Sequence, residues 1–84
     1  MAYKVVLYSS AVKDLGALPI EVRPRIASAL RDLADFPADR GIKKLKAPIG
    51  GFRKRVGDYR ILFDVSRQTI GVHRIKHRKD AYSP

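Results

Sequence analysis

Arginines recur in the C-terminal third of the chain at a spacing that suits phosphate binding. Arg53 and Arg55 are two residues apart in a run typical of a β-strand, and Arg60 follows a Gly-Asp turn. Because strand side chains alternate between faces, Arg53 and Arg55 share one face. Arg60 opens the next strand across the turn from Arg55, and neighbouring strands lie about 4.8 Å apart. We therefore expect three guanidinium groups to gather within the width of a nucleotide.

A cluster of three cations is unfavourable unless an anion lies among them. Guanidinium groups bind phosphate oxygens in a bidentate geometry, so a phosphate group is the anion that fits best. The alternative is three solvated arginines on an exposed sheet face with no ligand. The arginine spacing therefore favours a sheet that binds the backbone of a nucleic acid, RNA in our interpretation.

The positive charge lies almost entirely in the second half of the 84 residues. The 18 Lys and Arg residues against 8 Asp and Glu residues make a net charge of +10. Residues 1–42 carry six basic and five acidic groups, whereas residues 43–84 carry twelve basic and three acidic groups. A one-sided positive surface attracts polyanions and accelerates their binding. The charge distribution thus favours a polyanionic partner over a face that is merely solvated.

Other kinds of site are not indicated by the sequence. The chain has no cysteine, and its two histidines, His73 and His77, are not at metal-site spacing with a carboxylate, so we expect no metal and no cofactor. There is no Ser-His-Asp arrangement and no glycine-rich phosphate loop. No apolar run is long enough to span a bilayer and no signal peptide is recognisable, so we expect a cytoplasmic protein without membrane contact.

The N-terminal half is expected to supply a scaffold of one strand and two helices. Residues 3–8 are rich in β-branched and aromatic side chains, which favour a strand, and a short helix follows from Ser9 or Ser10 to Leu18. A second helix is expected from about Pro19 to Phe36. Pro24 removes a helical hydrogen bond, so that helix should start near Glu21 or contain a kink.

The C-terminal half is expected to form a meander of three strands. They are predicted at Phe52–Val56, Tyr59–Ser66 and Thr69–Lys76, the middle one central in the sheet, after a loop over residues 38–50. The order β-α-α-β-β-β predicts an α+β fold over residues 1–84 as a single domain. Two N-terminal helices would pack on a mainly antiparallel four-stranded sheet. We expect His73, inside the last strand, to be a packed residue.

Three stretches of the chain resemble a known group of proteins. The run R-x-R-V-G-D-Y-R at Arg53–Arg60, the tail H-R-K-D-x-Y at His77–Tyr82 and the start MAYKVVLYSSAVKDL are similar to the RelE/ParE superfamily of toxins from bacterial and archaeal toxin–antitoxin pairs. The resemblance covers essentially the whole chain. RelE-like members enter the ribosomal A site and cut mRNA, whereas ParE-like members act on DNA gyrase and lack the RNA-cutting residues.

The RelE-type chemistry that the resemblance implies needs no metal, because the 2′-hydroxyl attacks the adjacent phosphate. Arg53 and Arg55 fall where RelE enzymes place basic strand residues, often lysines. Arg60 matches their phosphate-stabilising arginine, and Arg78 matches the arginine near the leaving group. Tyr82 matches the tail tyrosine, which stacks on a base or helps to take the proton. These five residues are the predicted catalytic set.

The chain departs from the RelE pattern in the residue that would accept the proton. If Arg53 and Arg55 replace lysines, the base is less obvious, because arginine effectively does not lose its proton. Tyr82 and His77 are then the candidates. Lys76 also stands where relatives often have glycine.

The predicted function is the toxin of a type II toxin–antitoxin system that acts as a ribosome-dependent mRNA endoribonuclease. The expected partners are an acidic cognate antitoxin and the 70S ribosome with mRNA in its A site, with DNA reached only through the antitoxin. A ParE-like gyrase inhibitor without nuclease activity is the alternative, and an inert relative or a simple RNA-binding module is a third interpretation. Predicted contacts to RNA or ribosome are Lys43, Lys44, Lys46, Lys54, Lys76, His77 and Lys79, of which Lys54 points to the other face by parity.

Overall fold

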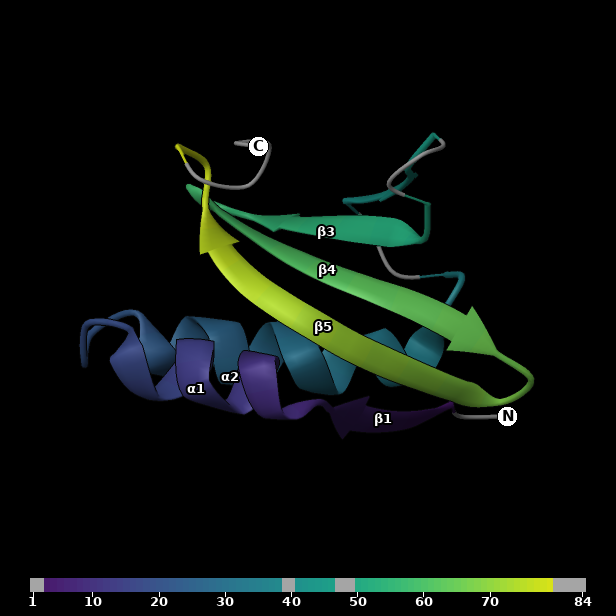
Figure 1. Cartoon of the computed structure of the whole chain (residues 1–84), viewed down its shortest axis with the longest axis horizontal. Coiled ribbons are helices and arrows are strands. Elements are labelled where there is room, and N and C mark those ends of the chain that lie inside the picture. Colours follow the sequence, from purple (N-terminus) through teal and green to yellow (C-terminus); the bar gives the residue numbers. More distant parts are fainter. Residues whose placement is uncertain (1–2, 39–40, 47–49, 80–84) are drawn as a thin grey trace.

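Two helices cover one face of a five-stranded sheet (Figure 1). The computed structural model describes residues 3–38, 41–46 and 50–79. In chain order the elements are β1 (Lys4–Leu7), α1 (Ser9–Ala17), α2 (Arg23–Asp32), the 3₁₀ turn η1 (Leu33–Asp35), β2 (Ile42–Lys44), β3 (Phe52–Val56), β4 (Tyr59–Ser66) and β5 (Thr69–His77). The α+β class, with both helices before the meander, is confirmed.

The sheet has one strand more than the four that the sequence predicts. Its order is β1-β5-β4-β3-β2, so β4 is central as expected. β1 runs parallel to β5 and all other pairs are antiparallel. The additional strand β2 lies in the segment expected to be a loop. Three residues are too short for a periodic signal, and β2 is held by its ladder with β3 and by packing of Ile42 against the core.

The second helix is shorter than expected at both ends. It begins at Arg23 and ends at Asp32, where the chain tightens into η1. Pro24 occupies the first turn, where the missing N–H has no partner in any helix, so Pro24 fits without a kink. No helix in the described ranges is long and apolar enough to cross a membrane.

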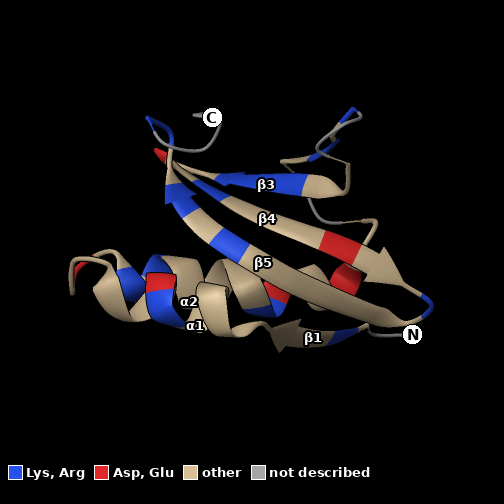
Figure 2. Ribbon diagram, viewed as in Figure 1, with Lys and Arg blue, Asp and Glu red and all other residues tan. Residues whose placement is uncertain are grey.

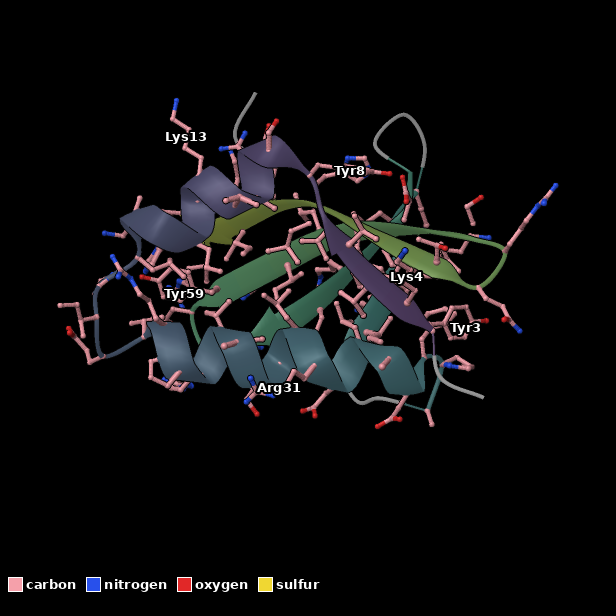
Figure 3. All side chains as sticks on the ribbon, turned by 90° about the horizontal axis from the view of Figure 1, so that it is seen from below. Tyr3, Lys4, Tyr8, Lys13, Arg31 and Tyr59 are labelled. Carbon is pink, nitrogen blue, oxygen red and sulfur yellow. The ribbon has the colours of Figure 1, made fainter. Side chains whose placement is uncertain are left out.

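The core fills the space between the helices and the inner face of the sheet (Figure 3). Its fully buried large side chains are Phe63, Ile26, Leu33, Ile61, Ile70 and Val72. Lys13 and Arg31 extend from the outer surfaces of the helices (Figure 3). Because the helices cover one face only, the opposite face of β2–β5 is left for polar side chains.

Candidate functional site

The uncovered face of the sheet carries a set of aligned basic residues, which Figure 2 shows concentrated on β3 and at one end of β4 and β5. Lys43 pairs with Arg53 between β2 and β3, and Arg55 pairs with Arg60, which pairs with Lys76 on β5. Cross-strand partners share a face, with Cβ atoms about 4.5–5.5 Å apart. These five residues are called the basic face below. The register places Arg53, Arg55 and Arg60 together, as expected.

Arg55 and Arg60 meet at the hairpin between β3 and β4. Arg55 Nε donates to the carbonyl oxygen of Gly57 at 3.3 Å, and Arg60 Nη1 donates to the same oxygen at 3.4 Å and to that of Tyr59 at 3.2 Å. Arg60 Nε is buried without a hydrogen-bond partner among the described residues. Within that part of the chain neither guanidinium pairs with a carboxylate, so both charges are available to an anion.

Two arginines from distant segments reach the same hairpin. The backbone N–H of Arg78, just beyond β5, donates to the carbonyl of Asp58 at 2.6 Å, and its Nη1 lies 3.9 Å from Asp58 Oδ1. Arg25 of α2 lies over Gly57, because a Cβ built there would be 2.8 Å from Arg25 Nη2. Arg78 was a predicted site residue. Arg25 was missed, since its sequence position reads only as an exposed helix residue.

A second missed pair joins α1 to β5 beside the basic face. β1 pairs with β5 only as far as Val72, and beyond it Asp14 of α1 takes the place of a strand. Asp14 Oδ2 accepts the Ile75 N–H at 2.9 Å and Arg74 Nε at 2.7 Å, and Oδ1 accepts Arg74 Nη2 at 3.2 Å. Arg74 keeps 43% of its side chain exposed. The carboxylate thus fixes Arg74 while leaving part of its surface open.

The charges of this pair are mutually stabilised. Partial burial by itself would raise the pKa of Asp14. The hydrogen bonds from Arg74 and the Ile75 N–H, with the positive charges of Arg74 and Lys76, outweigh burial and hold that pKa below 3.8. The hydrogen bond that Arg74 donates to Asp14 raises the pKa of Arg74 in turn. Nothing in the sequence signals this contact, because 60 residues separate its partners.

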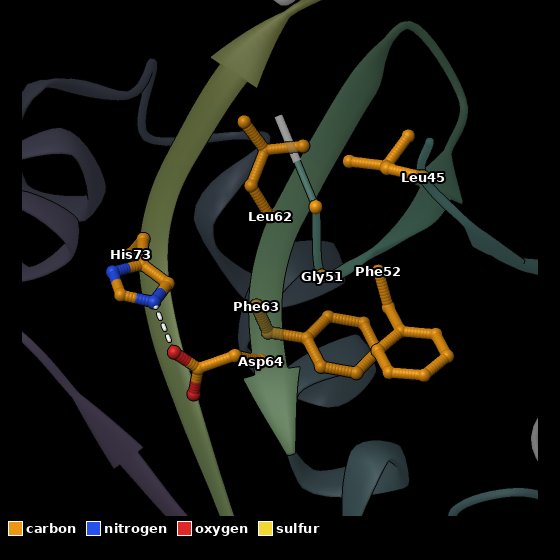
Figure 4. Close-up of a pocket in the computed structure, with 8 residues that line it drawn as sticks. Leu45, Gly51, Phe52, Leu62, Phe63, Asp64 and His73 are labelled. Carbon is orange, nitrogen blue, oxygen red and sulfur yellow. Dashed lines mark hydrogen bonds and ion pairs between the residues drawn. The ribbon is translucent and has the colours of Figure 1, made fainter. Parts of the chain in front are cut away.

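The other end of the uncovered face is hollowed (Figure 4). The pocket has a volume of about 310 Å³ and is lined by Leu45, Gly50, Gly51, Phe52, Leu62, Phe63, Asp64 and His73. His73 Nε2 lies 2.6 Å from Asp64 Oδ2. The rings of His73 and Tyr8 pack edge to face. The expectation that His73 is packed is wrong: a register shift between Leu62 and Phe63 leaves it exposed.

Several predicted RNA contacts lie away from the basic face. Lys54 is buried on the helix side, with Nζ 3.5 Å from the carbonyl of Ala29, which does not fit a surface contact to RNA. Lys44 alternates with Lys43 and so faces the other side. The His77 ring packs edge-on against Tyr59 and its Nδ1 accepts the Lys79 N–H at 3.3 Å.

Three further predicted residues lie beyond the strands. Lys46 and Lys79 are exposed past the ends of β2 and β5. Tyr82 lies outside the described residues, so its predicted place by the arginines stays a prediction. In the described ranges no three His, Asp or Glu side chains gather in a way that could hold a metal ion.

Comparison with known protein families shows to which family this chain belongs. The model of the family described as the ParE toxin of the type II toxin–antitoxin system parDE matches residues 5–82. The protein belongs to the RelE/ParE toxin superfamily. It is a RelE-like toxin of a type II toxin–antitoxin system, so the family that the resemblance indicated is confirmed.

Individual relatives agree with this assignment. Toxin RelE3 of Methanocaldococcus jannaschii is 38% identical over an alignment 85 positions long, which covers 94% of each chain. A chain of the toxin–antitoxin complex RelBE2 from Mycobacterium tuberculosis superposes with a TM-score of 0.81 at 30% identity, over 93% of this chain and 100% of that one. A chain of the RelB–RelE complex from Methanococcus jannaschii superposes with a TM-score of 0.76 at 32% identity, over 92% of this chain and 94% of that one.

Proposed function

We propose that this toxin is a ribosome-dependent, metal-independent mRNA endoribonuclease of the cytoplasm. One observation carries the proposal: Arg55, Arg60 and Arg78 converge on the Gly57–Asp58 hairpin. Such a group of guanidiniums suits a phosphodiester whose negative charge increases during reaction. Its place on an open sheet face suits a long, single-stranded substrate held in the ribosomal A site.

The arginines would act on the charges that develop during 2′-hydroxyl attack. The 2′-oxygen forms a bond to phosphorus and the bond from phosphorus to the 5′-oxygen breaks, which leaves a 2′,3′-cyclic phosphate. The departing 5′-oxygen takes a proton from water and becomes a 5′-hydroxyl. Arg55 and Arg60 stabilise the non-bridging oxygens, and Arg78 stabilises the departing 5′-oxygen. A donor placed in this way contributes roughly a hundredfold to a thousandfold in rate.

The proton of the 2′-hydroxyl needs an acceptor that an arginine does not provide. We assign this role to Tyr82, which would accept the proton as its phenolate, the form that nearby cations favour. His77 is arranged less well for it. When Nδ1 accepts the Lys79 N–H, the neutral ring carries its proton on Nε2, which then donates rather than accepts.

An acidic antitoxin is the partner that we propose for the basic face. The similar chains from Mycobacterium tuberculosis and Methanococcus jannaschii come from complexes of a toxin with its antitoxin. A partly disordered acidic segment that folds on binding would cover the arginines and exclude RNA. The product of the adjacent reading frame should co-purify with the toxin and restore growth, and failure of both would contradict this partner.

Gyrase inhibition is the second candidate function. It is favoured by the matched family model, which is described as ParE, and by the absence of a proton acceptor among the described residues that converge on Gly57. A binding toxin needs the positive surface without the chemistry. DNA would then be affected through gyrase rather than through direct contact with the basic face.

Primer extension separates the two functions. Purified protein is added to translating ribosomes and, in parallel, to gyrase with supercoiled DNA, with Arg60→Ala as the matched variant in both. Cuts inside codons that disappear with Arg60→Ala support the endoribonuclease. Intact mRNA together with gyrase-linked DNA breaks overturns it.

A further inference from the structure

The edge of β5 beyond Val72 is closed by a side chain of α1, which follows β1 alongside β5 (Figure 1). Asp14 accepts the backbone N–H of Ile75 through Oδ2 at 2.9 Å. That one hydrogen bond satisfies a strand N–H that has no partner strand. Asp14 nevertheless accepts two more hydrogen bonds, both from the guanidinium of Arg74. The carboxylate therefore completes the sheet edge and, in addition, holds an arginine in place.

The two hydrogen bonds hold one side of the Arg74 guanidinium and leave the other open. Nε and Nη2 donate to Asp14 at 2.7 and 3.2 Å. Nη1, with its two N–H groups, makes no hydrogen bond to the described residues. The side chain of Arg74 is 43% exposed, whereas that of Asp14 is 18% exposed. Arg74 thus presents a fixed donor that an anion can reach from solvent.

Lys76 lies beside this donor on the same face. Arg74 and Lys76 are two residues apart in β5, and Ile75 between them points into the core. Lys76 is near enough for its charge to act on Asp14, yet within the described ranges it forms no ion pair. Lys76 pairs with Arg60 across the strands, so Arg74 is the diagonal neighbour of Arg60, at about 7–8 Å. Successive phosphates along a single RNA strand are separated by a similar distance.

We propose that Arg74 and Lys76 form a second phosphate-binding site, and that Asp14 is the residue that positions Arg74 in it. The reacting phosphate lies at Arg60, and this second phosphate site takes the phosphate next to it along the strand. Nη1 of Arg74 and the ammonium of Lys76 donate to its non-bridging oxygens. The inference rests on the proposed function, because it states how the same face holds a further nucleotide.

The position of Arg78 gives the direction of the strand. Arg78 follows β5 and reaches the hairpin at Asp58, where it is assigned to the departing 5′-oxygen. Arg74 lies in the opposite direction along β5 from Lys76. The nucleotide that keeps the cyclic phosphate therefore extends toward Arg74. The second phosphate site binds the phosphate on the 5′ side of the cleaved bond.

RNA fits these two sites better than an acidic protein segment does. An RNA strand carries one negative charge at every nucleotide, so two cationic sites one step apart match two successive phosphates. The carboxylates of a protein segment have no such regular repeat. A phosphate also has enough free oxygens to accept from a guanidinium and an ammonium together. The spacing of Arg60 and Arg74 thus favours the RNA backbone as the occupant.

RNA binding tests the second phosphate site without cleavage. Fluorescence anisotropy with a short labelled single-stranded RNA is measured at several salt concentrations. Arg74→Ala should weaken binding about tenfold at low salt and reduce the slope of log K against log salt by about 0.7. Arg31→Ala removes the same charge from the outer surface of α2 and should change neither quantity. An unchanged slope for Arg74→Ala overturns the proposal and leaves Asp14 and Arg74 with a structural role only.

Asp14→Asn separates positioning from charge. If charge alone mattered, removal of a carboxylate beside the site would strengthen RNA binding. If Asp14 positions Arg74, binding should instead weaken about twofold to tenfold, the cost of ordering one free side chain. Glu21→Gln, on the exposed turn before α2, removes the same charge and should not weaken binding. Stronger binding by Asp14→Asn overturns the positioning role.

A double variant guards against loss of folding. Once Arg74→Ala is present, Asp14→Asn should not weaken RNA binding any further, because there is no arginine left to position. A further loss in the double variant would mean that Asp14 acts through the fold, which overturns the proposal. Weaker binding of a purified acidic antitoxin by Arg74→Ala, with RNA binding unchanged, also overturns it, because the site then binds protein.

A modified mRNA tests the position of the second phosphate on ribosomes. A single neutral methylphosphonate linkage is placed on the 5′ side of the cleaved bond. Wild type and Arg74→Ala should then cleave at equal rates, whereas on normal mRNA Arg74→Ala should be slower. A defect of Arg74→Ala that persists on the modified mRNA overturns the assigned position.

Cleavage and RNA binding can fail separately. A protein whose salt slope depends on Arg74 but that leaves mRNA intact on ribosomes retains the second phosphate site and loses the proposed endoribonuclease function. A protein that cleaves mRNA equally fast with and without Arg74 retains the function and loses the site. The two proposals are therefore distinguishable.

Discussion

Arg55 and Arg60 share one acceptor, the backbone carbonyl of Gly57, at 3.3 and 3.4 Å. They are cross-strand partners, and their pair lies next to the Val56–Tyr59 pair that flanks the turn. Each side chain curls back to the hairpin, so two like charges lie around a single oxygen. A neutral carbonyl offsets that repulsion only in part, and a phosphate between the guanidiniums would offset it further. The hairpin is thus arranged in advance for an anion.

Removal of Arg60 tests this arrangement. Arg60→Ala should slow cleavage on the ribosome by about a hundredfold or more, because one contact to the transition state is lost. Arg55→Ala should slow cleavage by a similar factor. The double variant should slow it by less than the product of the two single factors, since both groups bind one phosphate. The control is Arg31→Ala on the outer surface of α2, with a normal rate expected. Normal single-turnover rates for both hairpin variants would contradict the assignment.

Arg78 should act on the leaving oxygen rather than on the non-bridging oxygens. Arg78→Ala is expected to slow cleavage of normal mRNA by about a hundredfold. A substrate with sulfur in place of the 5′-bridging oxygen has a better leaving group that needs no such help. The defect of Arg78→Ala should nearly vanish on that substrate while the defect of Arg60→Ala persists. An equal defect of both variants on both substrates would place Arg78 elsewhere.

The contact of Asp14 with Arg74 and Ile75 should make stability depend on acid. The folded pKa of Asp14 is lowered, so its contribution is complete above the unfolded value of about 3.9 and is lost as pH falls through the folded value. Asp14→Asn should lower the free energy of unfolding by about 1–3 kcal/mol at pH 7, and the gap should shrink below about pH 4. Urea unfolding at both pH values measures it. A gap that is constant with pH would rule out this carboxylate as the cause.

Salt should weaken binding of the toxin to RNA. Each phosphate contact releases counterions, and for single strands the slope of log K against log salt falls by about 0.7 per contact. Arg55→Ala or Arg60→Ala should therefore reduce the slope by about 0.7, and Arg31→Ala should not change it. Fluorescence anisotropy with a short labelled RNA gives these slopes. Binding that is independent of salt would be incompatible with a phosphate-binding face.

Tyr82 lies outside the described residues, and its role is decided by two substitutions. If its hydroxyl accepts the proton, Tyr82→Phe should be nearly as slow as Tyr82→Ala in single-turnover cleavage. If the ring only stacks on a base, a contact of about 1–3 kcal/mol, Phe should behave as wild type and Ala should be slow. A lower midpoint of thermal unfolding for Ala, with cleavage per folded molecule unchanged, would remove Tyr82 from the site.

Local patterns in the sequence determined the strands of the meander and the face on which their arginines lie. Alternation along Phe52–Val56 separates Arg53 and Arg55 from buried Lys54, and a two-residue turn brings Arg60 opposite Arg55. These relations span few residues and follow from the period of a strand and the length of a turn. For the same reason the sequence indicated the helices and the central position of β4.

Tertiary packing alone decided which distant groups meet. Arg25 and Arg78 reach the hairpin from α2 and from the end of β5, and Asp14 meets Arg74 across 60 residues. The exposure of His73 depends on a register shift between β4 and β5. The alternation of residues within either strand does not predict that shift. The periodicity of an element determines which face a residue occupies, whereas its neighbours across the fold depend on how separate elements pack. The convergence on Gly57 and the pocket at Asp64 are therefore properties of the folded chain.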